Sequence, residues 1–118
     1  LRSIGVYHEG VETPGTEPLP EDAAFRLFAP PPNRMPPRPQ KGVAMGLFGP
    51  QAASGAAQAS HVVLINLDYG AAVTVGLSAR APFEVLDAIG SGTWMPTGAT
   101  RGELRFEPGG GRLVRVQP

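Results

Sequence analysis

Prolines and glycines interrupt this sequence so often that no stretch keeps a helical period of 3.6 residues over the length of an ordinary helix. The 118 residues include 14 prolines and 16 glycines. Proline fixes φ and removes a backbone donor, so segments rich in proline are extended or turning. We therefore expect short strands joined by turns, and not helices.

Short segments with the apolar or alternating pattern of β-strands recur along the second part of the chain. The strongest is His61 to Tyr69, a continuous apolar run typical of a strand that is covered on both faces. A tight connection at 68–70 predicts that this run forms a hairpin with the next strand. The pattern as a whole predicts an all-β fold, an antiparallel β-sandwich or barrel. The expected strands are 42–49, 61–69, 71–79, 82–88, 102–106 and 112–116.

Residues 1–41 differ in composition from residues 42–118, because they hold most of the prolines. Six prolines fall within 29–40, so neither a helix nor a central strand is expected there. This part could run as polyproline II, either as a free arm or as a strap over another surface. We therefore divide the chain into a Pro-rich extended connector, 1–41, and a β-sandwich, 42–118. Because the chain begins at Leu1 without a methionine or signal peptide, we expect it to be a piece of a longer protein.

Charge and cysteine content exclude several classes of function. Ten basic and ten acidic residues cancel, and the arginines are scattered, so a nucleic-acid partner is not expected. The chain has no cysteine, which excludes disulfides and cysteine-based zinc sites. No apolar run approaches the ~20 residues that span a bilayer, so no membrane span is expected.

The glycine run near the end of the sequence could be read as a phosphate-binding loop or as a turn. A phosphate-binding loop joins a strand to a helix and carries a Lys followed by Ser or Thr. Here the following residues alternate like a strand and no Lys is present. We therefore predict a structural turn that closes a hairpin between 102–106 and 112–116. Its residues are Pro108, Gly109, Gly110 and Gly111.

No catalytic residue, metal site or cofactor is predicted. The two histidines, His8 and His61, lack further ligands at metal-binding spacing. The acidic residues lie in Pro-rich loops or at turn-initiating positions, and the serines have no nucleophile motif. We expect this chain by itself not to be an enzyme.

Aromatic side chains are the remaining candidates for contact with a ligand. Trp94, expected in a turn, either packs in the core or stacks on a sugar ring, and Tyr69 could share that role. Tyr7 and His8 form a polar aromatic cluster that either contacts a partner domain or a ligand, here a carbohydrate, or is a plain loop.

The order of features from residue 42 on resembles the C-terminal β-sandwich domain that follows the (β/α)8 catalytic barrel in many glycoside hydrolases. The resemblance rests on a strand ending in Asn-x-Asp, an alternating strand, an acidic strand followed by Gly and Trp, and the glycine turn with its final strand. These features are Asn66 with Asp68, 73–77, Glu84 and Val85 with Asp87, Gly92 with Trp94, and 108–116. The resemblance implies a small antiparallel β-sandwich preceded by a long Pro-rich irregular segment.

The resemblance also implies a function. The chain would be a non-catalytic accessory domain that packs on the catalytic barrel of the same parent chain and borders its substrate cleft. The parent would be an extracellular or cell-envelope glycoside hydrolase, whose catalytic acids lie on the barrel. The alternative is an autonomous carbohydrate-binding module in which Trp94 and Tyr69 form a platform for polysaccharide. A plain structural sandwich is the third reading.

Overall fold

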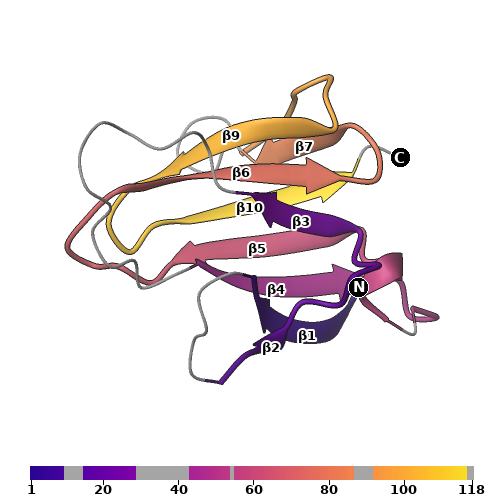
Figure 1. The fold of residues 1–118 in the computed structure, drawn as a ribbon. Coiled ribbons are helices and arrows are strands. Elements are labelled where there is room, and N and C mark those ends of the chain that lie inside the picture. The colour runs from indigo at the N-terminus through magenta and orange to yellow at the C-terminus, as the bar shows by residue number, and fades with distance from the viewer. Residues whose placement is uncertain (10–14, 29–42, 54, 87–91, 117–118) are drawn as a thin grey trace.

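The computed structural model describes residues 1–9, 15–28, 43–53, 55–86 and 92–116 of the chain. Within these ranges the chain forms ten strands and one three-residue 3₁₀ helix, and no α-helix (Figure 1). The all-β prediction is therefore confirmed for the described residues. The elements are β1 (Arg2–His8), β2 (Glu17–Pro18), β3 (Phe25–Phe28), β4 (Val43–Gly49), η1 (Ala56–Gln58), β5 (His61–Asn66), β6 (Val73–Ala79), β7 (Phe83–Leu86), β8 (Trp94–Pro96), β9 (Arg101–Phe106) and β10 (Gly111–Val116).

These strands form two sheets. The larger sheet has seven strands in the order β2-β1-β4-β5-β10-β7-β8, and the smaller has three in the order β3-β6-β9 (Figure 1). The neighbouring strands described are antiparallel, except β1 and β2, which run parallel. The strand with the continuous apolar sequence, β5, occupies the middle of the larger sheet, as its composition predicts.

Alternation along the strands gives the larger sheet two distinct faces. Met45 pairs with Leu64 and Leu47 pairs with Val62 across β4 and β5, and all four side chains are fully buried. We call the face that carries these four side chains the inner face and the opposite one the outer face.

Side chains from both sheets form one apolar core. The smaller sheet contributes Phe25, Leu77 and Phe106, one from each of its strands, and all three are fully buried. They belong to the same cluster as the inner-face residues of the larger sheet. Burial of a side chain of this size stabilises a fold by about 1.5–3 kcal/mol. The smaller sheet thus covers the inner face, and the outer face points away from the core.

The two predicted hairpins are not formed. β5 and β6 lie in different sheets, and so do β9 and β10. β5 instead pairs with β10, and β6 pairs with β9. The connections 67–72 and 107–110 therefore both cross from one sheet to the other. Alternation identifies a strand and its buried face, but it does not say which other strand supplies the hydrogen bonds.

The described part of residues 1–41 contributes strands to both sheets, which differs from the extended connector expected there. β1 is hydrogen-bonded along β4, and β3 along β6. The sequence did not reveal them because β1 is interrupted by Gly5, and β3 has only four residues and is followed by the proline-rich residues 29–40. The predicted proline strap, 29–41, lies outside the described residues, and the division of the chain at residue 42 stays a prediction.

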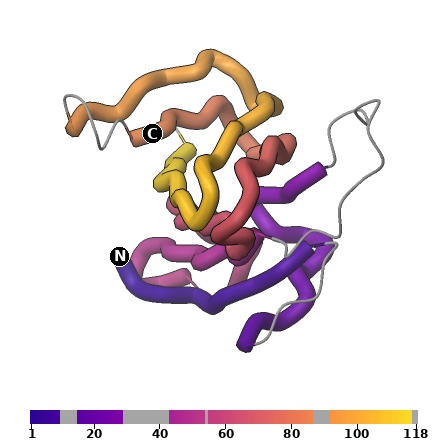
Figure 2. Tube along the Cα trace, turned by 90° about the vertical axis from the view of Figure 1, so that its left-hand side faces the viewer, coloured from indigo at the N-terminus to yellow at the C-terminus, as the bar shows by residue number. Residues whose placement is uncertain are grey.

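Two perpendicular views show how the strand order spreads the chain in space. β1 lies at the bottom of Figure 1 and β9 at the top, and the indigo and orange segments keep these places in Figure 2. In the larger sheet, β1 and β8 are separated by the four strands β4, β5, β10 and β7. Side chains on β1 and β8 therefore belong to opposite sides of the molecule.

Candidate functional site

Four side chains from four different strands gather on the outer face beside the edge formed by β8. They are His61 of β5, Glu84 of β7, Trp94 of β8 and Arg115 of β10, and we call them the Trp94 cluster. The register explains the gathering, because Arg115 is the Cα partner of both His61 and Glu84. Side chains directly opposite on one face of an antiparallel pair have Cβ atoms about 4.5–5.5 Å apart.

Arg115 is the centre of this cluster. Its Nε donates a hydrogen bond of 3.0 Å to Oε1 of Glu84, and its guanidinium carbon lies 4.2 Å from the ring centroid of Trp94. Glu84 is only 8 % exposed. A carboxylate so far from water needs a paired charge, and Arg115 supplies it. Stacking on the indole adds a cation–π contact that holds the guanidinium in place.

His61 completes the cluster through its ring. Its imidazole meets Trp94 edge to face, with ring centroids 5.9 Å apart and an interplanar angle of 75°. Its Nδ1 lies 2.8 Å from Oγ of Ser60. Burial, and then the positive charge of Arg115, lower the pKa of His61 below its ordinary value of 6.5. The imidazole is therefore mostly neutral at pH 7.

Trp94 lies in a strand and not in the turn that the sequence predicted. β8 pairs with β7, with Trp94 opposite Leu86 and Pro96 opposite Glu84. The Trp94 side chain is half-buried, because the Arg115 guanidinium and the His61 ring cover part of it. This arrangement combines the two roles considered for Trp94, packing and availability for contact.

Tyr69 stands far from Trp94. It follows the end of β5, whereas Trp94 contacts His61 at the start of the same strand, and β5 is about 17 Å long. Tyr69 is 80 % exposed, and its ring lies against Gly109, where an added Cβ would come within 2.8 Å of Tyr69 Cδ1. The structure does not bring Tyr69 and Trp94 together as one platform.

The glycine turn lies beside the connection that carries Tyr69. Gly109 has φ of 66°, a left-handed conformation that favours glycine, and its N–H donates to the carbonyl oxygen of Asp68. Pro108 precedes it in the turn, and Gly110 donates to the carbonyl oxygen of Glu107. Gly111 already belongs to β10. The run links two sheets, where the sequence predicted a hairpin within one.

Asn66 fastens the two inter-sheet connections to each other. Its side chain is 1 % exposed, and its Nδ2 donates to the carbonyl oxygens of Ala71 at 2.9 Å and Glu107 at 3.2 Å. Its Oδ1 accepts from the backbone N–H of Asp68 at 3.0 Å. The Asn-x-Asp pattern that carried the family resemblance is thus a structural device that closes this end of the fold.

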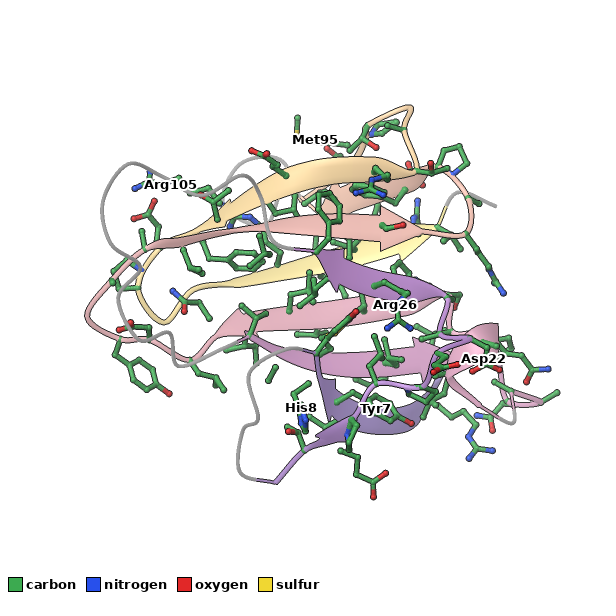
Figure 3. The ribbon with its side chains drawn as sticks, viewed as in Figure 1. Tyr7, His8, Asp22, Arg26, Met95 and Arg105 are labelled. Atoms are coloured by element: carbon green, nitrogen blue, oxygen red, sulfur yellow. The ribbon has the colours of Figure 1, made fainter. Side chains whose placement is uncertain are left out.

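Tyr7 and His8 lie on the opposite side of the molecule from β8. Figure 3 shows both at the bottom, near β1 and β2, with Met95 of β8 at the top. Five strand spacings of about 4.8 Å place β1 roughly 24 Å from β8. His8 Nδ1 lies 2.7 Å from Thr16 Oγ1, and half-buried Tyr7 borders an open depression of about 290 Å³. Tyr7 and His8 therefore belong to a region separate from the Trp94 cluster.

The outer face of the larger sheet carries apolar side chains on its central strands. Gly46 pairs with Val63 and Val63 pairs with Leu113, which continues the row across β4, β5 and β10. Val63 and Leu113 are half-buried, and Ile65 farther along β5 is 40 % exposed. Val6 of β1, opposite Gly46, is 49 % exposed. Beyond the Trp94 cluster, the outer face is thus an apolar surface that remains partly open to solvent.

Within the described ranges, no group of three or more His, Asp or Glu side chains could hold a metal ion. Among the same residues, no helix is long and apolar enough to cross a membrane. Comparisons with family models, curated proteins and solved structures find no match to this chain.

Sequence reasoning missed the roles of Glu84, Arg115 and His61 in surrounding Trp94. The three positions are 23 and 31 residues apart along the chain. Only the pairing of β10 with both β5 and β7 brings them side by side. The one sequence signal was the placement of charged residues within otherwise apolar strands, where a charge needs a cross-strand partner.

Proposed function

We propose that this chain is a non-catalytic accessory domain of a glycoside hydrolase. In this proposal it is a small β-sandwich that packs on the (β/α)8 catalytic barrel of the same parent chain. The outer face of the seven-stranded sheet is its docking surface. The domain contributes to the parent enzyme by covering apolar surface on the barrel and bordering its substrate cleft.

The observation that carries the proposal is the apolar outer face. A strand with apolar side chains on both of its faces, like Val62 to Ile65 of β5, is typical of a sheet covered on both faces. The smaller sheet covers the inner face, but Ile65 and Val6 on the outer face remain 40 % and 49 % exposed. Exposed apolar side chains that share one face of a sheet with half-buried ones, as Ile65 does with Val63 and Leu113, are a feature of surfaces that bind another protein or domain.

Two further features support the proposal. Two sheets that share one apolar core are the architecture of a β-sandwich, the fold that the family resemblance implies. The features that carry the resemblance also include Asn66 and Asp68, which hold the inter-sheet connection. In the family, the catalytic acids lie on the barrel, so the accessory domain needs none of its own.

The alternative, an autonomous carbohydrate-binding module, has one observation in its favour. Tyr69 is 80 % exposed and its ring is braced against Gly109, as a sugar-stacking residue requires. Trp94 of β8, however, lies beside the other end of β5, where it contacts His61, and Arg115 partly covers its ring. A single stacking platform needs both rings together, so the docking role has the stronger support.

Hydroxyl-radical footprinting of the full-length parent chain and of residues 1–118 alone tests the docking surface. We expect Val63, Ile65 and Leu113 to be labelled in the isolated chain and protected in the parent, with Tyr69 labelled equally in both. Equal labelling of the apolar residues would refute docking through this face. Hydrolysis of a panel of chromogenic glycosides by the parent tests the enzyme class separately, because docking and hydrolysis can fail independently.

A further inference from the structure

We propose that the Trp94 cluster is a pH-responsive latch on the edge strand β8. When His61 is protonated, it competes with Arg115 for the indole ring, and β8 loosens from β7. This inference goes beyond the proposed function and does not depend on it.

The first step is that β8 is a short edge strand whose ring contacts come from Trp94. It is three residues long, it lies at the edge of the larger sheet, and β7 is its hydrogen-bonded neighbour among the described strands. The Thr97 hydroxyl, just after β8, also donates to the carbonyl oxygen of Phe83. Pro96 has no backbone N–H to donate, and Met95 is 55 % exposed. Trp94 is the large side chain of β8 that packs on its neighbours, and both contacts described for its ring are with Arg115 and His61.

The second step is the shortage of partners for a second cation. Arg115 faces His61 from β10, and its charge is already matched by Glu84 of β7. The residue opposite His61 on β4 is Phe48, which carries no charge. The amino group of Leu1 adds a weaker repulsion. A protonated His61 thus has the Ser60 hydroxyl and the Trp94 indole as its neighbours, and Arg115 already lies against that indole.

The third step is that both cations gain by reaching the same ring. An imidazolium, like a guanidinium, is attracted to the face of an indole. A protonated His61 in its present contact with Trp94 shares that indole with Arg115, so two cations lie against one ring. Repulsion between them displaces Arg115 from the ring, which removes one of the contacts that fix Trp94. The low pKa of His61 agrees with a closed latch at neutral pH.

Two measurements on the chain between pH 8 and pH 5 test the latch. Trp94 is the sole tryptophan, so acrylamide quenching reports its accessibility directly. Hydrogen exchange followed by NMR reports the β8 amides and that of Thr97, which donates to the carbonyl oxygen of Phe83. We expect the quenching constant, and the exchange rate of these amides divided by the intrinsic rate at each pH, to rise about two- to fivefold as His61 is protonated, which is the population change that one cation–π contact supports.

Two histidine variants make the test specific. His61→Gln keeps a polar side chain but cannot be protonated, so its β8 signals should not change over this pH range. His8→Gln, on the far side of the molecule, should retain the full response. Amides of β4 and β5 serve as the internal reference, since a global loss of stability raises exchange there as well.

Three results would overturn the latch. One is a His61 that NMR shows to be protonated while Trp94 quenching and β8 exchange stay constant. Another is a full response in His61→Gln. The third is an equal rise of exchange in β4, β5 and β8, which would mean global destabilisation. The first is read from the unsubstituted chain, so the test does not depend on the folding of a variant.

Discussion

Removing the Asn66 side chain tests how the two sheets are joined. The substitution Asn66→Ala deletes the donations to the carbonyl oxygens of Ala71 and Glu107 and the acceptor for the Asp68 N–H. Asn66 is 1 % exposed, so water replaces these partners poorly. At about 1 kcal/mol for each net hydrogen bond, the three together are worth about 3 kcal/mol. The expected result is a loss of that size in the free energy of unfolding.

Two neighbouring substitutions separate this role from a general effect of the turn. Asp68→Ala removes only the acceptor for the Gly70 N–H, in an exposed position, and should cost less than about 1 kcal/mol. Asn66→Asp keeps the acceptor for the Asp68 N–H but aims a carboxylate at two carbonyl oxygens. It should be at least as destabilising as Asn66→Ala, because a buried charge without a donor is costly.

Urea unfolding followed by far-ultraviolet circular dichroism and by Trp94 fluorescence measures these differences. A loss of about 3 kcal/mol in a chain of this size lowers the melting temperature by on the order of 10 °C. If Asn66→Ala changes the free energy of unfolding by less than about 1 kcal/mol with an unchanged urea dependence, Asn66 does not hold the two connections together. The reasoning would also fail if Asp68→Ala cost as much as Asn66→Ala.

Three further predictions concern the sheets themselves. Gly76→Ala should lower the free energy of unfolding by about 1–3 kcal/mol, because the added Cβ would overlap the Phe28 ring. Urea unfolding measures this loss, and the double substitution Gly76→Ala with Phe28→Ala should recover part of it. Arg115→Ala should lower the free energy of unfolding by about 2 kcal/mol, because it leaves the Glu84 carboxylate buried and unpaired. The double substitution Arg115→Met with Glu84→Gln removes both charges and should lower it by less. The lowered pKa of His61 means that the unfolded chain binds more protons between that pKa and 6.5. The contribution of His61 to the free energy of unfolding should therefore fall as pH drops through this window and stay constant above it. Urea unfolding at a series of pH values measures this. A rise toward low pH, or the same pH dependence in His61→Gln, would contradict the prediction.

Several strands were predictable because the burial of one or both faces of a strand requires a recognisable local pattern of apolar residues. The alternation of Val43, Met45 and Leu47 identified β4 and its buried face, and the apolar run from His61 identified the central strand. β1 and β3 left a weaker trace, since β1 is interrupted by Gly5 and β3 is four residues long and is followed by the proline-rich residues 29–40. Local patterns therefore revealed the strands that have long apolar runs and missed those that do not.

Pairing could not be predicted in the same way, and the candidate site depends on pairing. A short connection such as 67–72 favours a hairpin when nothing else is known, because closing a short loop costs little entropy. Here that preference is overridden by a core that needs β5 and β6 on opposite sides. The Trp94 cluster exists only because β10 lies between β5 and β7, a fact that no local pattern contains.

The features behind the family resemblance and those behind the docking proposal are largely different residues. Asn66, Asp68 and Gly109 satisfy hydrogen bonds where the chain crosses between sheets, a need shared by any two-sheet fold with two adjacent crossings. Val63 and Ile65 have no such role, since they lie on the outer face, away from the core. Strand preference and the cross-strand pairing of Val63 with Leu113 favour such residues, but they do not require Ile65 to stay 40 % exposed. Under the docking proposal a covering partner would bury Ile65, so footprinting of these two side chains tests that proposal directly.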